Sequence, residues 1–304
     1  MLVSVVVCTH ELERYDDFSE AVASVLGQRY EPVEVVIVVD GNERVAGRAR
    51  EEFGDRPNVG VHCNETNRGV AASRTKGARL ATGDVVAFID DDAVAEPGWV
   101  AELVAAYDRE DALAVGGRMT GEWLAGRPRY LPDEFDWLVG VTHRGFAEAG
   151  EEVRNTFESN ISFRRDVFLE LGGFDPSLGP TAEEYRHSEG AELGIRLRDG
   201  YGRGVVYAPD AVVRHKVFEK RTRLGWLLAR AIEQGVSKRR LERLSGTGVD
   251  EEFDHLSTLF TRDVPRRLRG LVRAPSVAGL AQFVMLFVLT GAVGVGYLYG
   301  LFAA

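Results

Sequence analysis

Three consecutive carboxylates, Asp90-Asp91-Asp92, directly follow an apolar run from Val85 to Ile89. Repulsion among three adjacent anions costs free energy, and burial increases that cost. A bound Mg²⁺ or Mn²⁺ would offset it, because hard divalent cations prefer carboxylate oxygens. Side chains alternate along an extended chain, so Asp90 and Asp92 face one way and Asp91 the other. The spacing therefore predicts that Asp90 and Asp92 hold one metal ion, the alternative being a solvated acidic turn after a strand.

The apolar stretches around this cluster predict buried parallel strands. Residues 2–8 and 33–39 are nearly continuous apolar runs, as expected for strands covered on both faces, and 58–63 is a weaker run. Apolar side chains recur at helical spacing in 18–26 and 70–80. This alternation of strand and helix predicts a doubly wound α/β half.

Ligands of doubly wound folds bind at the carboxyl ends of the strands. The polar side chains that follow the predicted strands at these ends are Thr9, His10, Glu11, Asp40 and the three aspartates. We therefore expect them to converge on one edge of the sheet. For Asp40-Gly41 the alternative is a simple turn after a buried strand.

The second half of the chain is less regular. Short strands are predicted at 116–119, 160–163 and 204–208, an acidic helix over 181–197 and a basic amphipathic helix over 223–243. The last strand would lead into Arg214-His215-Lys216. No repeat or low-complexity linker separates these elements.

Charge is unevenly distributed along the 304 residues, whose net charge is −10. Residues 214–273 carry a local charge of +7, which leaves −17 on the remainder. Such self-repulsion is best tolerated where salt screens it, which indicates a salt-adapted source. We expect no nucleic-acid partner. The two cysteines, Cys8 and Cys63, lie in apolar runs and suit buried thiols in a reducing compartment.

The C-terminal segment predicts a membrane anchor. Residues 276–304 contain no charged side chain, and Val277 to Phe302 would form a helix of about 39 Å, longer than the roughly 30 Å of a hydrocarbon core. The alternative is a buried core helix. Five arginines precede the segment; they are Arg262, Arg266, Arg267, Arg269 and Arg273. The positive-inside rule then places residues 1–275 in the cytoplasm, and no signal peptide is visible at the N-terminus.

Several ordered motifs resemble the inverting, metal-dependent GT-A glycosyltransferases of family 2. In the first half they are Leu2–Cys8 with Thr9, Val35–Asp40, Asn67-Arg68-Gly69 with Arg74, and Phe88–Asp92. In the second half they are Asn160–Arg165 and Gly172-Gly173-Phe174-Asp175. The resemblance covers roughly residues 1–240, and an ordered set of motifs is far more specific than a single one. It implies a GT-A fold, with a nucleotide-binding half followed by an acceptor-binding half.

The resemblance also implies roles at the donor site. Thr9, Glu11 and Asp40 would contact the uracil and ribose of a UDP-sugar, with Arg74 and Asp91 completing the nucleotide-sugar site. The alternative for Arg74 is a solvated residue on a helix surface. Asp90 and Asp92 would hold Mg²⁺ or Mn²⁺ against the diphosphate, and His215 would be a third ligand. A lone histidine is also often a structural or surface residue.

An inverting transfer needs a base for the acceptor hydroxyl. Family members carry Glu-Asp at this place, with the aspartate as the base, whereas this chain has Glu189-Gly190. Glu189 is the nearest candidate, and Glu192 would lie nearly one helical turn onward; both could instead be solvated acids at a helix start. The motif that begins at Asn160 and includes Arg164 would bind the acceptor.

These features predict a membrane-anchored UDP-sugar transferase. Its expected parts are a GT-A domain over 1–213, a basic membrane-proximal segment over 214–275 and an anchor over 276–304. By resemblance to haloarchaeal members of the family, the favoured donor sugar is glucuronic acid, and the acceptor is a saccharide linked to dolichyl phosphate in protein N-glycosylation. The basic segment suits membrane lipid. Two alternatives remain, a dolichyl-phosphate hexose synthase that uses UDP-glucose and a non-catalytic UDP-sugar-binding subunit.

Overall fold

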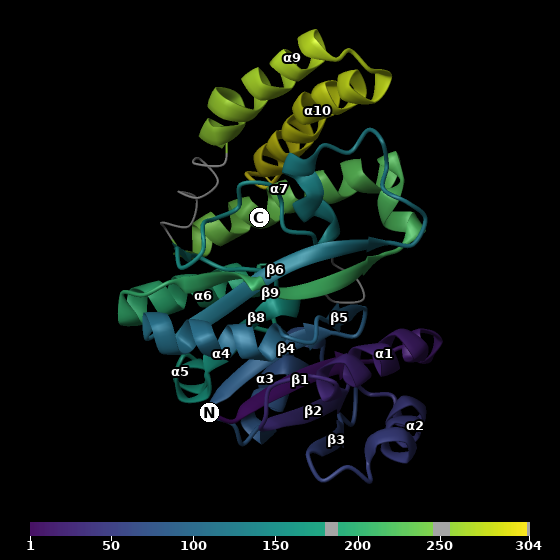
Figure 1. The fold of residues 1–304 in the computed structure, drawn as a ribbon, viewed down its shortest axis with the longest axis vertical. Coiled ribbons are helices and arrows are strands. Elements are labelled where there is room, and N and C mark those ends of the chain that lie inside the picture. The colour runs from purple at the N-terminus through teal and green to yellow at the C-terminus, as the bar shows by residue number, and fades with distance from the viewer. Residues whose placement is uncertain (180–187, 246–255, 303–304) are drawn as a thin grey trace. The chain divides into compact units, whose positions relative to one another are not determined.

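The computed structural model describes residues 1–179, 188–245 and 256–302 (Figure 1). The chain divides into two compact units. The first consists of Met1–Thr120 and Ala147–His215, and the second of Gly121–Phe146 and Lys216–Ala304. This division groups residues 121–146 with the C-terminal segment. The sequence-based boundaries, at 213 and 275, had placed residues 121–146 in the first domain.

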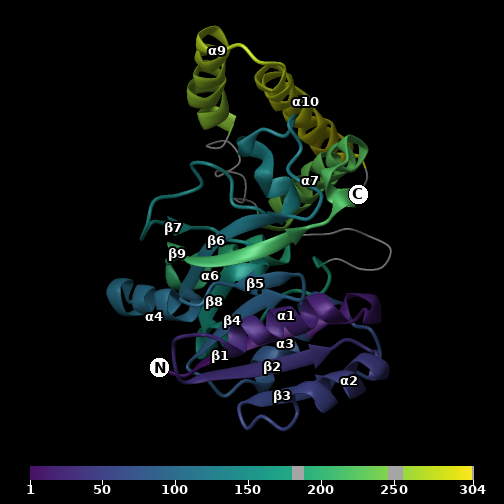
Figure 2. The same ribbon diagram turned by 45° about the vertical axis from the view of Figure 1, so that its right-hand side comes forward.

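The first unit is built on one mixed sheet, with strand order β3-β2-β1-β4-β8-β6-β9-β5 and β7 beside β9. Its strands are β1 (Val3–Thr9), β2 (Val33–Val39), β3 (Val59–Cys63), β4 (Val85–Asp90), β5 (Ala93–Ala95), β6 (Ala114–Trp123), β7 (Glu152–Val153), β8 (Ile161–Arg164) and β9 (Val205–Val217). The first four run parallel, whereas β8 joins β4 in antiparallel register. Figure 2 shows β1, β2 and β3 side by side. The predicted α/β nucleotide-binding half is confirmed.

Valine-rich strands are covered on both faces of this sheet. Val5 and Val7 of β1 belong to one buried cluster, and Val6 belongs to the other. The first cluster includes side chains of α1 (Tyr15–Leu26), α2 (Glu43–Phe53) and α4 (Trp99–Glu110). The second includes side chains of α3 (Val70–Leu80), α5 (Arg165–Glu170) and α6 (Glu189–Tyr201). Because β-branched side chains pack well on a pleated surface, these runs form the centre of the sheet.

Several elements differ from the sequence expectations. Helices α2 and α4 were not predicted; α2 buries Val45, Ala46, Ala49 and Phe53 among many charged residues. Strand β9 is also longer than the predicted 204–208, because its later residues pair with β5 in the register Ala93↔His215. His215 therefore lies within a strand rather than after one. The start of the helix predicted over 181–197 falls on residues outside those described, and α6 begins at Glu189.

The second unit is helical in its described C-terminal part. Its helices are η2 (Asp133–Val139), η4 (Glu219–Thr222), α7 (Leu224–Ser245), η5 (Leu259–Asp263), α9 (Val264–Arg273) and α10 (Val277–Tyr299). Leu227 of α7 and Leu286 and Leu289 of α10 are fully buried in one apolar cluster. The two helices approach closely at Gly296, where an added β-carbon would lie 1.9 Å from the Ile232 carbonyl oxygen.

Candidate active site

The predicted site residues at the carboxyl ends of β1, β2 and β4 lie at one edge of the sheet. Register pairs Thr9 with Val39 and Cys8 with Asp90, so β1, β2 and β4 end together. Thr9 and Asp40 are buried there, whereas Glu11 is exposed. This edge therefore collects several carboxylates within a small region.

The aspartate cluster divides into two groups. Strand β4 ends at Asp90 and the chain turns at Asp91 and Asp92, so the alternation of an extended chain does not continue through the cluster. Asp90 forms an ion pair with Arg74, whereas Asp91 and Asp92 both face Arg14. Asp90 and Asp92 therefore have different arginine partners, and a metal ion held by both remains a prediction.

Arg14 is a site residue that the sequence reasoning missed. It ends the short helix η1 (Leu12–Arg14), five residues beyond β1. One of its terminal nitrogens lies 2.8 Å from Asp92 Oδ2 and 3.3 Å from Asp91 Oδ1. The Thr9 hydroxyl also donates to Asp91, at 2.8 Å. Burial raises the pKa of Asp91 to about 7, and the negative charge of Asp92 adds to this rise. The positive charge of Arg14 opposes it.

His215 and Asp92 form the part of the site that best fits a divalent cation. His215 Nε2 lies 3.5 Å from Asp92 Oδ1, and both side chains are buried. The β5–β9 register brings them together, since His215 pairs with Ala93, the residue after Asp92. No group of three or more His, Cys, Asp or Glu side chains suited to a metal occurs in the described part of the chain. An aspartate and a histidine supply one oxygen and one nitrogen ligand, so substrate phosphates would have to complete the coordination of a divalent cation here.

Asp40 organises the loop that leads into α3. Its carboxylate accepts hydrogen bonds from the backbone N–H groups of Arg68 and Gly69 at 2.8–3.1 Å. The Asn64 side-chain amide donates a further bond, at 2.7 Å. The φ angle of Gly69 is 85°, a conformation that favours glycine. Asp40 thus fixes the backbone beside the strand ends, and its contact with a nucleotide remains a prediction.

Arg74 is a buried residue of α3, and not a solvated one on the helix surface. Its guanidinium pairs with Asp90 and lies 3.5 Å from Glu189 Oε1. The pKa of Arg74 is raised, since the attraction of Asp90 and Glu189 outweighs the opposing effect of burial. Arg74 therefore connects the end of β4 with the start of α6.

The two predicted bases have different surroundings. Glu189 is 1% exposed, and its Oε2 has no hydrogen-bond partner among the described residues. Burial and the neighbouring Glu158 raise the pKa of Glu189 to about 8, although Arg74 opposes them. Glu192 instead binds Arg196 on its own helix, at 2.6 Å. Glu158 is a second residue that the sequence reasoning missed, and no local motif marks it.

The predicted acceptor residues have other partners. Asn160 is fully buried, accepts a bond from Trp99 Nε1 at 2.8 Å and donates to the Ala211 carbonyl at 2.9 Å. Arg164 pairs with Val85 at the amino end of β4, the end opposite the aspartates. Asn160 thus ties strands together, and the structure does not bring Arg164 to the carboxylate site. The antiparallel direction of β8 is the reason, because it carries the motif away from that edge.

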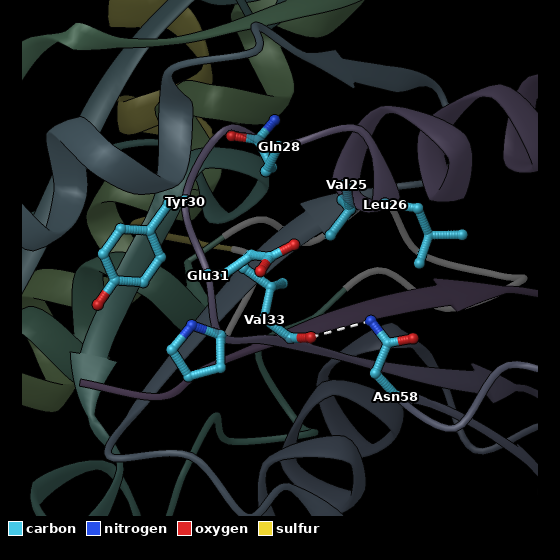
Figure 3. A pocket seen from close by; sticks show the side chains of 8 residues that line it. Val25, Leu26, Gln28, Tyr30, Glu31, Val33 and Asn58 are labelled. Atoms are coloured by element: carbon cyan, nitrogen blue, oxygen red, sulfur yellow. Dashed lines mark hydrogen bonds between the residues drawn. The ribbon is translucent and has the colours of Figure 1, made fainter.

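A pocket also lies away from the carboxylates. Figure 3 shows it beside the start of β2, where the Asn58 amide donates to the Val33 carbonyl at 3.0 Å. Its lining residues are Val25, Leu26, Gln28, Tyr30, Glu31, Pro32, Val33 and Asn58. Since β2 is parallel to β1 and β4, this pocket belongs to the amino-terminal edge of the strands.

Comparison with known sequences gives a family and a close relative. The profile of the family described as "Glycosyl transferase family 2" matches residues 4–172. The chain is 51% identical over 302 residues to the Haloferax volcanii protein named glucosyl-dolichyl phosphate glucuronosyltransferase, covering 99% of this chain and 96% of that protein. It is 28% identical over 226 residues to the succinoglycan biosynthesis protein ExoM of Rhizobium meliloti, covering 72% and 68% of the two chains.

Solved structures share the fold. A mannosyltransferase from Pyrobaculum calidifontis, in complex with GDP-Man and Mn²⁺, aligns with a TM-score of 0.59 at 18% identity, covering 98% of this chain and 87% of that one. Residues 1–349 of S. aureus TarS, in complex with UDP-GlcNAc, align with a TM-score of 0.56 at 16% identity, covering 98% and 89%. These similarities show the GT-A fold.

Proposed function

Because this chain belongs to glycosyl transferase family 2 and is a glycosyltransferase, we propose that it transfers glucuronic acid from UDP-glucuronate to a saccharide linked to dolichyl phosphate. The observation that carries the proposal is 51% identity over almost the full length of both chains to a relative named for that activity. This transfer would be one step of archaeal protein N-glycosylation.

The carboxylate edge of the first unit supplies the donor site. Asp92 and His215 would hold a divalent cation, Mg²⁺ or Mn²⁺, which when bound neutralises charge on the departing diphosphate. Arg14 holds Asp91 and Asp92 in position, and Arg74 holds Asp90. Asp40 fixes the loop before α3 through the backbone of Arg68 and Gly69. The chain thus orients the UDP-sugar beside a cluster whose negative charge requires a cation.

A transfer assay with full-length protein in membranes tests the proposal. Labelled UDP-glucuronate, UDP-glucose and UDP-N-acetylglucosamine are offered separately, each with dolichyl phosphate or with glucosyl-dolichyl phosphate. We expect label in lipid-linked product from UDP-glucuronate and the glucosylated acceptor alone. Transfer from UDP-glucose to bare dolichyl phosphate would contradict the proposed activity and support the alternative hypothesis of a dolichyl-phosphate hexose synthase. UDP release without sugar transfer would reject both.

Helix α10 provides the membrane attachment that we propose. It is 23 residues long, about 34 Å, and apolar enough to cross a bilayer. Outward apolar side chains such as Val277, Val295 and Leu298 are more than half exposed. A single span that follows five arginines would leave the catalytic unit in the cytoplasm.

The partner of α10 within the second unit bears on this arrangement. Near the far end of α10, the Tyr297 hydroxyl lies 2.5 Å from Glu242 Oε2, and Arg239 also contacts Tyr297. Both charged residues belong to α7. To stay beside Tyr297 at the far end of a spanning α10, charged residues of α7 would have to cross the bilayer core, which costs several kcal/mol. A span therefore requires α10 to leave the charged end of α7, whereas an in-plane helix keeps this contact.

Cysteine labelling separates the two arrangements. The variant Leu301→Cys is made after Cys8 and Cys63 are replaced by alanine, and intact cells are treated with a membrane-impermeant maleimide. A span exposes position 301 outside the cell and gives labelling before lysis. Labelling only after lysis would reject the span and support an in-plane helix held on α7.

A further inference from the structure

The carboxylate of Glu158 occupies the space beside the backbone of Gly190. The Gly190 N–H donates to Glu158 Oε1 at 3.1 Å. A β-carbon added at position 190 would lie 2.1 Å from the same oxygen and 2.8 Å from the Glu158 carboxyl carbon. A side chain at 190 and Glu158 in its present position therefore exclude each other. Glycine at 190 is what admits the glutamate from another part of the chain.

Glu158 lies directly beside the donor edge of the sheet. It begins the short helix η3 (Glu158–Asn160), and the next residue, Ser159, accepts a hydrogen bond from the backbone N–H of Asp90 at 3.0 Å. The bond to Gly190 ties Glu158 to the first turn of α6, where backbone N–H groups favour a negative charge. The glutamate thus connects the end of β4 with the start of the helix that carries Glu189.

Glu158 is the more accessible member of a carboxyl pair. It is half-buried, whereas Glu189 is 1% exposed and faces Arg74. The second oxygen of Glu189 has no hydrogen-bond partner within the described residues, which is costly for a buried carboxylate and fits a proton held there. Burial raises the pKa of both groups, and their mutual repulsion adds to the rise for Glu189. A proton on Glu189 would leave Glu158 as the carboxylate of the pair.

We propose that Glu158 is the base for the acceptor hydroxyl, and that Gly190 makes room for it; the inference rests on the proposed inverting transfer. The hydroxyl proton passes to the Glu158 carboxylate while the acceptor oxygen bonds to the anomeric carbon. The bond from that carbon to the β-phosphate oxygen breaks, and its electron pair leaves with UDP. Glu189 retains its proton and limits the negative charge next to Glu158.

The substitution Glu158→Gln tests this role. Glutamine keeps an oxygen that can accept from the Gly190 N–H, so a role limited to capping α6 survives the change. Loss of a positioned base lowers kcat by about 10²–10⁴-fold. We expect that loss with an unchanged Kd for UDP-glucuronate, while the exposed Glu51→Gln on α2 serves as the matched control. Wild-type turnover in Glu158→Gln would overturn the proposal, as would loss confined to Glu189→Gln.

A rescue experiment tests the shared space. Glu158→Ala removes the carboxylate. The double variant Glu158→Ala/Gly190→Asp then supplies a carboxylate from position 190, where the Glu158 side chain had left no room for one. We expect the double variant to transfer at least about tenfold faster than Glu158→Ala, since part of the value of a base returns. A double variant that binds UDP-glucuronate but is no faster would overturn the proposal.

The donor assay separates failure of this inference from failure of the proposed function. If the wild type uses a different UDP-sugar, the substrate assignment fails, and the same variants are compared with that sugar. If the wild type transfers glucuronic acid and Glu158→Gln does so equally well, only the base assignment fails.

Discussion

Two carboxylate sites, one in each unit, differ in how closely arginines pair with the buried oxygens. In the second unit, Glu134 is 1% exposed and is bound by two arginines. Arg267 donates from Nε and from a terminal nitrogen at 2.6–3.0 Å, and Arg266 donates at 2.5 Å. Burial alone would raise the pKa of Glu134, but the bonds from Arg267 outweigh it and lower that pKa. Here both oxygens of the buried carboxylate are paired with guanidinium groups.

At the proposed donor edge of the first unit, fewer arginines than carboxylates form ion pairs among the described residues. Its acidic groups are Asp90, Asp91, Asp92, Glu158 and Glu189, and the arginines that contact them are Arg14 and Arg74. The pKa of Asp91 is raised to about 7 and that of Glu189 to about 8, burial being the largest cause of each. A buried carboxylate with both oxygens paired thus keeps its charge, whereas burial favours protonation of the less fully paired carboxylates at the donor edge.

The largest expected effect is that of Asp92→Ala on transfer. Removing this carboxylate takes away a proposed cation ligand, and loss of such electrostatic stabilisation costs about 10²–10³-fold or more in kcat. Initial rates at saturating UDP-sugar measure it, with circular dichroism as the check of folding. Full transfer by Asp92→Ala, or by the wild type in EDTA, would show that the carboxylates of the first unit do not need a cation for transfer.

Glu134→Gln should destabilise the second unit by about 3 kcal/mol, because breaking a buried ion pair leaves uncompensated charge on the arginines. Thermal unfolding at pH 7 measures the loss. Since the pKa of Glu134 is lowered in the folded state, its contribution is present above the unfolded pKa and fades as pH falls through the folded pKa. The difference between wild type and variant should therefore shrink in acid. A constant difference between pH 7 and pH 3 would contradict this account.

Arg14→Gln should strengthen cation binding by about tenfold, since it removes a positive charge beside Asp91 and Asp92. The shift of the melting temperature by Mn²⁺, titrated without nucleotide, reports the change. Asp92→Ala provides the opposite comparison and should bind Mn²⁺ more weakly. Equal affinity in wild type and Arg14→Gln would show that Arg14 does not compete with a cation.

Glu189→Gln should stabilise the folded protein on the order of 1 kcal/mol above pH 8. A carboxyl whose pKa is raised to about 8 favours the folded state when protonated and opposes it when ionised. Wild-type stability should therefore fall as pH rises from about 4.5 to about 8 and level off above it, whereas the neutral amide avoids this penalty. Unfolding midpoints between pH 5 and pH 9 test it, and a gain that does not grow with pH would count against a shared proton.

Strong local patterns made much of the fold predictable. The valine-rich runs became β1 and β2, and the first helix ended near the predicted residue, since buried strands need apolar side chains on both faces. Helix α2 was missed because charged residues surround its few apolar side chains. Strand β9 was underestimated because its later residues alternate between buried and partly exposed, and pairing with β5 extends it.

The sequence by itself determined the carboxylates at the strand ends, the family motifs and the uncharged C-terminal segment. These are local features, set by residue type and spacing along a few turns of chain. Only the tertiary structure decided which charges meet. A turn separated Asp90 from Asp92, and folding brought Arg74 to Glu189, 115 residues away, and Glu158 to Gly190, 32 residues away. Such contacts depend on strand register and helix packing, so no spacing along the chain encodes them.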